Sequence, residues 1–185
     1  GSLYRGFKPV LWSTVEKTAL ADAEVEYQDH KSDTIYTCFP VKSSDIKEIL
    51  GSDIVIWTTT PWTIPANKAL AYNKNLDYLL IEINDDGDFC NKKIVVAEAL
   101  LESMIKECNI KKFKNLKKFN GKDFKGTICS HPFIQLGYDY NIPMLDARFV
   151  TTEQGTGIVH CAPSHGPDDF NLCLNNGIKA IETVD

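Results

Sequence analysis

Short runs of apolar residues alternate with turn-forming residues along most of the chain, a pattern typical of β-strands. From it we predict strands at residues 23–27, 34–41, 53–59, 69–72, 78–83, 93–96 and 158–161. Helical spacing of apolar residues is less common, and it predicts helices at residues 45–50, 97–108 and 167–176. The stretch Asn-Asp-Asp-Gly-Asp at 84–88 is typical of a hairpin turn. This many short strands predict a sheet that closes on itself.

The helix predicted at 167–176 has signals at both ends. Pro167 suits the first helical position, and Gly177 can end the helix. Asp168 and Asp169 fall in the first turn, where the partial positive charge of a helix N-terminus stabilises carboxylates. At least one of these aspartates is therefore expected to be ionised and directed at whatever lies above the turn.

The composition indicates one globular domain. The chain has 185 residues, of which 43% are hydrophobic and 10% aromatic. No apolar run approaches the roughly 18 residues that a membrane span needs, so no membrane partner is expected. Gly1 and Ser2 resemble a cloning scar, and residues 3–185 are expected to form a single domain.

The net charge and the cysteines indicate which partners and which cellular compartment to expect. The net charge of -5 gives no overall attraction to nucleic acid, so such a partner has to be held locally or by a neighbouring domain. We interpret the basic stretch from Lys111 to Lys118 as a solvated face, with phosphate contact as the alternative. The six cysteines include no C-x-x-C pair, which favours free thiols and a cytoplasmic protein.

The first unusual stretch is WTTTPWTIPAN, residues 57–67. Along a strand, Thr58 and Thr60 share one face and Thr59 takes the other, until Pro61 ends the ladder. One interpretation is a strand edge whose hydroxyls bond the backbone. The other is a rigid wall of hydroxyls that holds a small polar ligand.

The second unusual stretch is GTGIVHCAPSHGPDDF, residues 155–170. His160 and Cys161 point to opposite faces of a strand, so they cannot form a catalytic dyad, and Cys161 is expected in the core. A metal site is a further reading, because several ligand-type residues lie close in sequence: His160, His165, Asp168, Asp169 and Cys173. The prolines and glycine between them give no helix on which both histidines converge, so no metal is expected.

Both stretches resemble motifs of the editing domain that is inserted in isoleucyl-tRNA synthetases of class I. Thr60-Pro61-Trp62 is similar to the isoleucyl branch, since the valyl and leucyl branches carry Arg-Pro after two threonines. Residues 5–27 also resemble the segment that leads into this domain, although Ser13-Thr14-Val15-Glu16 replaces a C-x-x-C of many bacterial members. The signatures HIGH and KMSKS are absent, so no ATP use or ligase activity is expected from this fragment.

This resemblance implies an α+β fold with a closed antiparallel β-barrel core and peripheral helices. It also implies post-transfer editing, the hydrolysis of valine wrongly esterified to tRNA(Ile). A pocket that accepts isoleucine cannot strongly reject an amino acid one methylene smaller, a limit for which this synthetase is the standard example. A second pocket that excludes isoleucine would remove the error by attack of a positioned water, without a covalent intermediate or cofactor.

The resemblance also assigns roles to residues. Asp169 is expected to bind the α-ammonium group, Thr60 to hold the ester or the attacking water, and His160 to lie beside the amino-acid side chain and the ribose. Further contacts to the substrate are expected from Trp57, Thr58, Thr59, Thr63, Asn67 and Ala162. The expected partners are the 3′ aminoacyl end of tRNA(Ile), its valine moiety and the rest of the synthetase, in a monomer. A tRNA-binding module without hydrolysis and a metal-dependent hydrolase are the alternatives.

Overall fold

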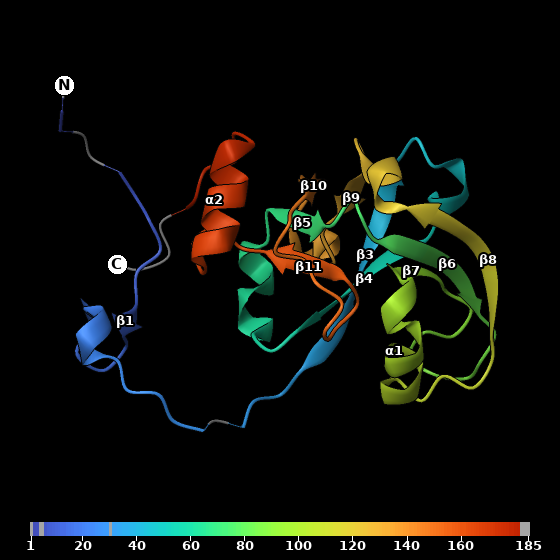
Figure 1. Cartoon of the computed structure of the whole chain (residues 1–185), viewed down its shortest axis with the longest axis horizontal. Coiled ribbons are helices and arrows are strands. Elements are labelled where there is room, and N and C mark those ends of the chain that lie inside the picture. The colour runs from blue at the N-terminus through green and yellow to red at the C-terminus, as the bar shows by residue number, and fades with distance from the viewer. Residues whose placement is uncertain (1, 4–5, 30, 182–185) are drawn as a thin grey trace.

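The computed structural model in Figure 1 describes residues 2–3, 6–29 and 31–181. Gly1 of the expected scar and Arg5 of the lead-in segment lie outside the described residues. The main sheet has the strand order β11-β5-β10-β9-β3-β4-β7-β6-β8, and β1 pairs with β2 separately. The strands are β1 (Trp12–Ser13), β2 (Thr18–Ala19), β3 (Ile35–Ser43), β4 (Asp53–Thr58), β5 (Ala69–Tyr72), β6 (Asp77–Ile83), β7 (Lys93–Ala97), β8 (Phe113–Asn120), β9 (Ile128–Ser130), β10 (Asn141–Asp146) and β11 (Ile158–Cys161).

Helices are short, and α1 (Leu101–Glu107) packs against the strands β4, β6 and β7 (Figure 1). The other α-helix is α2 (Pro167–Asn175), and both are close to the predicted bounds. The helix predicted at 45–50 is only the single 3-10 turn η2 (Lys47–Ile49), where Gly51 takes a left-handed conformation that ends it. The other 3-10 segments are η1 (Asp22–Glu24), η3 (Pro61–Ala66), η4 (Glu98–Leu100), η5 (Gly121–Phe124) and η6 (Ile134–Leu136).

The closed antiparallel barrel was a wrong prediction. The strand order is open, with β11 and β8 at its ends, and the sheet is mixed because β4 runs parallel to β7 and β5 parallel to β10. The open, mixed sheet follows from the segment after β4. There η3, which contains Pro61 and Pro65, turns the chain away and prevents a hairpin between β4 and β5. The strand β5 pairs instead with β10 and β11, which brings β11 beside β4 (Figure 1).

Five strands were not predicted, namely the short pair β1 and β2 and the strands β8, β9 and β10 of the main sheet, and one predicted strand does not form. In β8 the side chains of the first six residues are exposed, and in β10 Pro143 interrupts the apolar pattern. Of residues 23–27, the first two belong to η1 and the other three pair with no described strand. The remaining predicted strands are confirmed, as is the turn at 84–88 between the antiparallel strands β6 and β7.

The core covers both faces of the central strand β4. Ile54 and Ile56 pack with Leu70 in one apolar cluster, whereas Val55 packs with Met104 of α1 in another. Because the face alternates along a strand, the row of Ile54 and Ile56 continues to Thr58 at the strand end. The hydroxyl of Thr58 therefore lies at the edge of the main apolar cluster. In the described part of the chain, no helix has the length and apolar character of a membrane span.

Candidate functional site

A pocket of about 320 Å³ opens where β4 passes into η3 and where β11 leads to α2. Its walls come from two segments about a hundred residues apart in sequence, which the contact between β4 and β11 brings together. It is lined by Trp57, Thr58, Thr60, Trp62, Thr63, Val159, His160, Ala162, His165 and Asp169. The two unusual stretches of the sequence therefore face each other across one space, which we call the pocket.

The threonines divide as strand alternation predicts. Thr58 and Thr60 both line the pocket, and their Oγ1 atoms lie 3.2 Å apart. Thr59 is exposed and lines a neighbouring hollow of about 250 Å³, which shares Trp57, Thr58 and Val159 with the pocket. Of the three hydroxyls, two are therefore available to one ligand and the third is directed elsewhere.

His160 is locked in one tautomer by its neighbours. The hydroxyl of Thr63 donates to the carbonyl of Thr60 at 2.8 Å, so it accepts from Nε2–H of His160, also at 2.8 Å. Asn67 donates through Nδ2 to Nδ1 of His160 at 2.9 Å. The ring is therefore neutral, with its proton on Nε2. We call His160, Thr63, Thr60 and Asn67 the histidine network.

Burial reinforces this state of His160. The side chain is buried, and burial together with the nearby His165 and His131 lowers its pKa to about 4. Both ring nitrogens are already bonded to protein groups, so neither is offered to a ligand. His160 therefore presents a fixed ring surface to the pocket.

Asn67 lies behind the pocket wall. Its side chain is fully buried, and Nδ2 also donates to the carbonyl of Ala69 at 2.9 Å. Its Oδ1 has no hydrogen-bond partner among the described residues. Asn67 is not among the residues that line the pocket, and its amide contacts His160.

Asp169 is the one acidic side chain among the lining residues. It lies in the first turn of α2, and its Oδ2 accepts from the backbone N–H of Ala162 at 2.9 Å. Burial raises the pKa of Asp169, and Asp168 adds to this, while the bond from Ala162 opposes it. The helix N-terminus alone predicts the opposite direction, so the desolvation of this carboxyl outweighs it.

Three lining residues were not among the expected site residues, namely Trp62, Val159 and His165. Trp62 and His165 lie inside the two unusual stretches of the sequence. What the sequence did not predict is that their side chains line the pocket. Val159 precedes His160 in β11, and the pocket is lined by both residues. In the described part of the chain, no group of three His, Cys, Asp or Glu side chains is arranged to hold a metal ion.

Comparison with known proteins places this chain in a family. The family model described as "tRNA synthetases class I (I, L, M and V)" matches residues 1–154. The chain belongs to this family. Within it, this class I synthetase chain is 83% identical over 185 residues to the isoleucine–tRNA ligase of Pelagibacter ubique (strain HTCC1062). It is 46% identical over 190 aligned positions to that of Gluconobacter oxydans (strain 621H).

Both alignments cover 100% of this synthetase chain but 20% of each relative, so the chain spans about a fifth of their length. The fold is also similar to a solved structure, the cytosolic leucyl-tRNA synthetase editing domain of P. knowlesi. The TM-score is 0.58 at 14% identity, over 77% of this chain and 60% of the other. The mixed sheet with few helices thus resembles the fold of this editing domain.

Proposed function

We propose that this chain is the editing domain of an isoleucine–tRNA ligase and that the pocket hydrolyses the ester of valine mischarged on tRNA(Ile). The observation that carries the proposal is the meeting of the threonine hydroxyls and the carboxylate of Asp169 across one pocket. A carboxylate suits an α-ammonium group, and hydroxyls suit an ester and a ribose. The isoleucine–tRNA ligase relatives and the editing-domain fold support the same function.

Asp169 is the anchor for the ammonium group in this proposal. Its Oδ2 is held by Ala162, whereas Oδ1 accepts no hydrogen bond from the described residues and is open to a ligand. A cation beside this half-buried carboxyl lowers its raised pKa again and strengthens the ionised form. Binding of the ammonium group and ionisation of Asp169 therefore favour each other.

Water is the attacking group in this proposal. The described lining residues include no serine or cysteine beside a base, and neutral His160 has no free nitrogen with which to take a proton. The hydroxyls of Thr58 and Thr60 can orient a water molecule against the ester carbonyl, while Asp169 fixes the amino-acid end. Rate acceleration then comes from orientation and electrostatics.

Size exclusion comes from the rigid side of the pocket. The His160 ring is held at both nitrogens, so it cannot turn aside for a larger side chain without breaking two buried hydrogen bonds. Ala162, two residues after His160, is also buried, and its backbone N–H is held by its bond to Asp169. A valyl group is accepted and the extra methylene of isoleucine is refused.

Asp169→Asn in the synthetase that carries this chain tests the function. We expect deacylation of Val-tRNA(Ile) to fall on the order of 100-fold or more, since a paired and partly buried charge is lost. Asp168→Asn is the matched control, because Asp168 is exposed on the same helical turn and does not line the pocket.

Unchanged deacylation in Asp169→Asn would remove the anchor role. If the wild-type protein binds charged tRNA without releasing valine, a binding module is the better description. Loss of activity with a chelator would point to a metal-dependent hydrolase instead.

A further inference from the structure

The segment η3 carries Trp62 and Thr63 into the pocket, and two of its six residues are prolines. It contains Pro61 and Pro65, which donate no backbone hydrogen bond. Its own bonds to the adjoining chain are Thr63 N–H to the carbonyl of Thr60 and Asn67 N–H to the carbonyl of Ile64, each 3.0 Å. Such a short 3-10 segment needs support from elsewhere to keep one conformation.

That support comes from behind the pocket through His131. This side chain is fully buried, and its Nε2 lies 2.9 Å from the carbonyl oxygen of Ile64 in η3. Its Nδ1 accepts from the backbone N–H of Phe133 at 3.0 Å, so Nε2 carries the proton and donates to Ile64. The ring also stacks on Tyr138 at 4.8 Å between centroids, which fixes its plane.

Tyr140 provides the second support. Its hydroxyl donates to the carbonyl of Asn67 at 2.9 Å, directly after η3. The ammonium group of Lys68 lies 3.9 Å from the centre of the Tyr140 ring. Tyr140 therefore contacts two consecutive residues, Asn67 through its hydroxyl and Lys68 through its ring. Asn67 is the residue whose amide holds His160, so Tyr140 acts on the histidine network through the Asn67 backbone.

We propose that His131 and Tyr140 are positioning residues of the pocket: from behind, they hold η3 by the carbonyls of Ile64 and Asn67, and they thereby fix Thr63 and His160. Neither side chain lines the pocket. The inference rests on the proposed editing function for its kinetic consequence, but the anchoring of η3 does not. The two parts are therefore measured separately.

Tyr140→Phe removes one hydroxyl and leaves the ring that contacts Lys68. We expect hydrogen–deuterium exchange of residues 61–67 to rise about 10-fold, as the loss of one buried hydrogen bond allows. Tyr138→Phe is the matched control, because it makes the same chemical change in the same aromatic group, and no described bond depends on its hydroxyl. Equal exchange in Tyr140→Phe and Tyr138→Phe would overturn the anchoring.

The kinetic consequence is tested in the synthetase that carries the chain. For Tyr140→Phe and His131→Phe we expect kcat for Val-tRNA(Ile) deacylation to fall about 10-fold with little change in KM, because orientation is lost while the ammonium anchor remains. His131→Gln should restore part of the rate, since its amide can still donate to the carbonyl of Ile64.

Each outcome has a separate meaning. Faster exchange with unchanged kcat would overturn positioning for catalysis, and a rise in KM alone would do the same. A wild-type protein that does not deacylate Val-tRNA(Ile) would refute the proposed function, while the exchange measurement would still decide the anchoring. If His131→Phe does not fold, Tyr140→Phe alone decides the question.

Discussion

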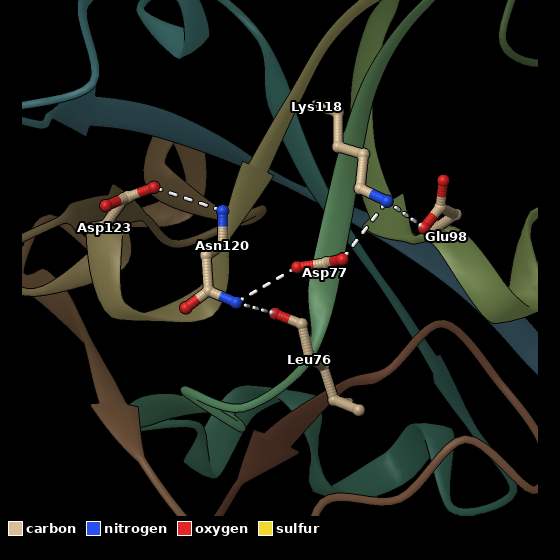
Figure 2. A network of polar contacts seen from close by, with 6 residues as sticks. All are labelled: Leu76, Asp77, Glu98, Lys118, Asn120 and Asp123. Atoms are coloured by element: carbon tan, nitrogen blue, oxygen red, sulfur yellow. Dashed lines mark hydrogen bonds and ion pairs between the residues drawn. The ribbon is translucent and has the colours of Figure 1, made fainter.

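Two polar networks at opposite ends of the sheet use similar bonds in different surroundings. In the histidine network, His160 of β11 is buried together with Thr63 of η3 and Asn67, and both nitrogens of the imidazole are bonded. The other, which we call the edge network, places Lys118 of β8 between Asp77 and Glu98, with Asn120 bonded to Asp77 (Figure 2). The Lys118, Asp77 and Glu98 side chains are each about half exposed. From this difference we expect exposure to solvent, more than the number of bonds, to decide how much a polar group contributes to the free energy of unfolding.

The largest expected difference between the two networks is their dependence on pH. The pKa of His160 is about 4 in the folded chain against an ordinary 6.5, so the unfolded chain binds the proton more readily. Stability from this group is therefore complete above pH 6.5 and is lost as the pH falls toward 4, by about 3 kcal/mol. Burial also lowers the pKa of His131, which acts in the same direction, whereas the raised pKa of Asp169 acts in the opposite one.

The edge network has a different window. Bonds from Asn120 and Lys118 lower the pKa of Asp77 below its ordinary 3.8, so its contribution is lost only at lower pH. Urea unfolding of wild type and His160→Asn between pH 4.5 and 7.5 separates the two networks. We expect a steeper loss of stability in the wild type, and parallel curves would contradict the assignment to His160.

A smaller effect is expected from Thr63→Val, which keeps the shape of the side chain and removes its hydroxyl. The Nε2–H of His160 then loses its acceptor in a buried position, and the carbonyl of Thr60 loses a donor. We expect the free energy of unfolding to fall by about 2 kcal/mol. Chemical denaturation at pH 7.5, where His160 is neutral, measures it. No loss of stability would mean that the histidine network is not held through Thr63.

The sequence was informative about the histidine network in a particular way. Local patterns located β4 and β11 and the alternation of Thr58, Thr59 and Thr60, because these depend on neighbouring residues alone. The place of Asn67 behind the wall could not be predicted, since it depends on how η3 packs against residues far along the chain. The raised pKa of Asp169 escaped for a similar reason, because burial is a property of the whole fold.

The edge network could not be predicted from the sequence, because its strand β8 lacks the local pattern that identified β4 and β11. Its strand β8 is rich in lysine and largely exposed, so it has no apolar alternation to detect, and charged side chains are a common feature of strands at the edge of a sheet. The basic stretch from Lys111 to Lys118 does lie on a solvated face, where Lys117 pairs with Glu48 at 2.7 Å. The open strand order was equally out of reach, because η3 and the pairing of β5 set it across the whole chain.

The smallest effect is expected from Lys118→Met, which removes the charge at the centre of the edge network and keeps most of the aliphatic stem. Lys118 loses two ion pairs at 3.1 and 2.6 Å, but water replaces them, because all the partners are exposed to solvent. The change in unfolding free energy should be at least about threefold smaller than for Thr63→Val, and deacylation of Val-tRNA(Ile) should not change. Denaturation of both variants in the same buffer makes the comparison. An equal loss in the two variants would show that the exposed bonds count as much as the buried ones.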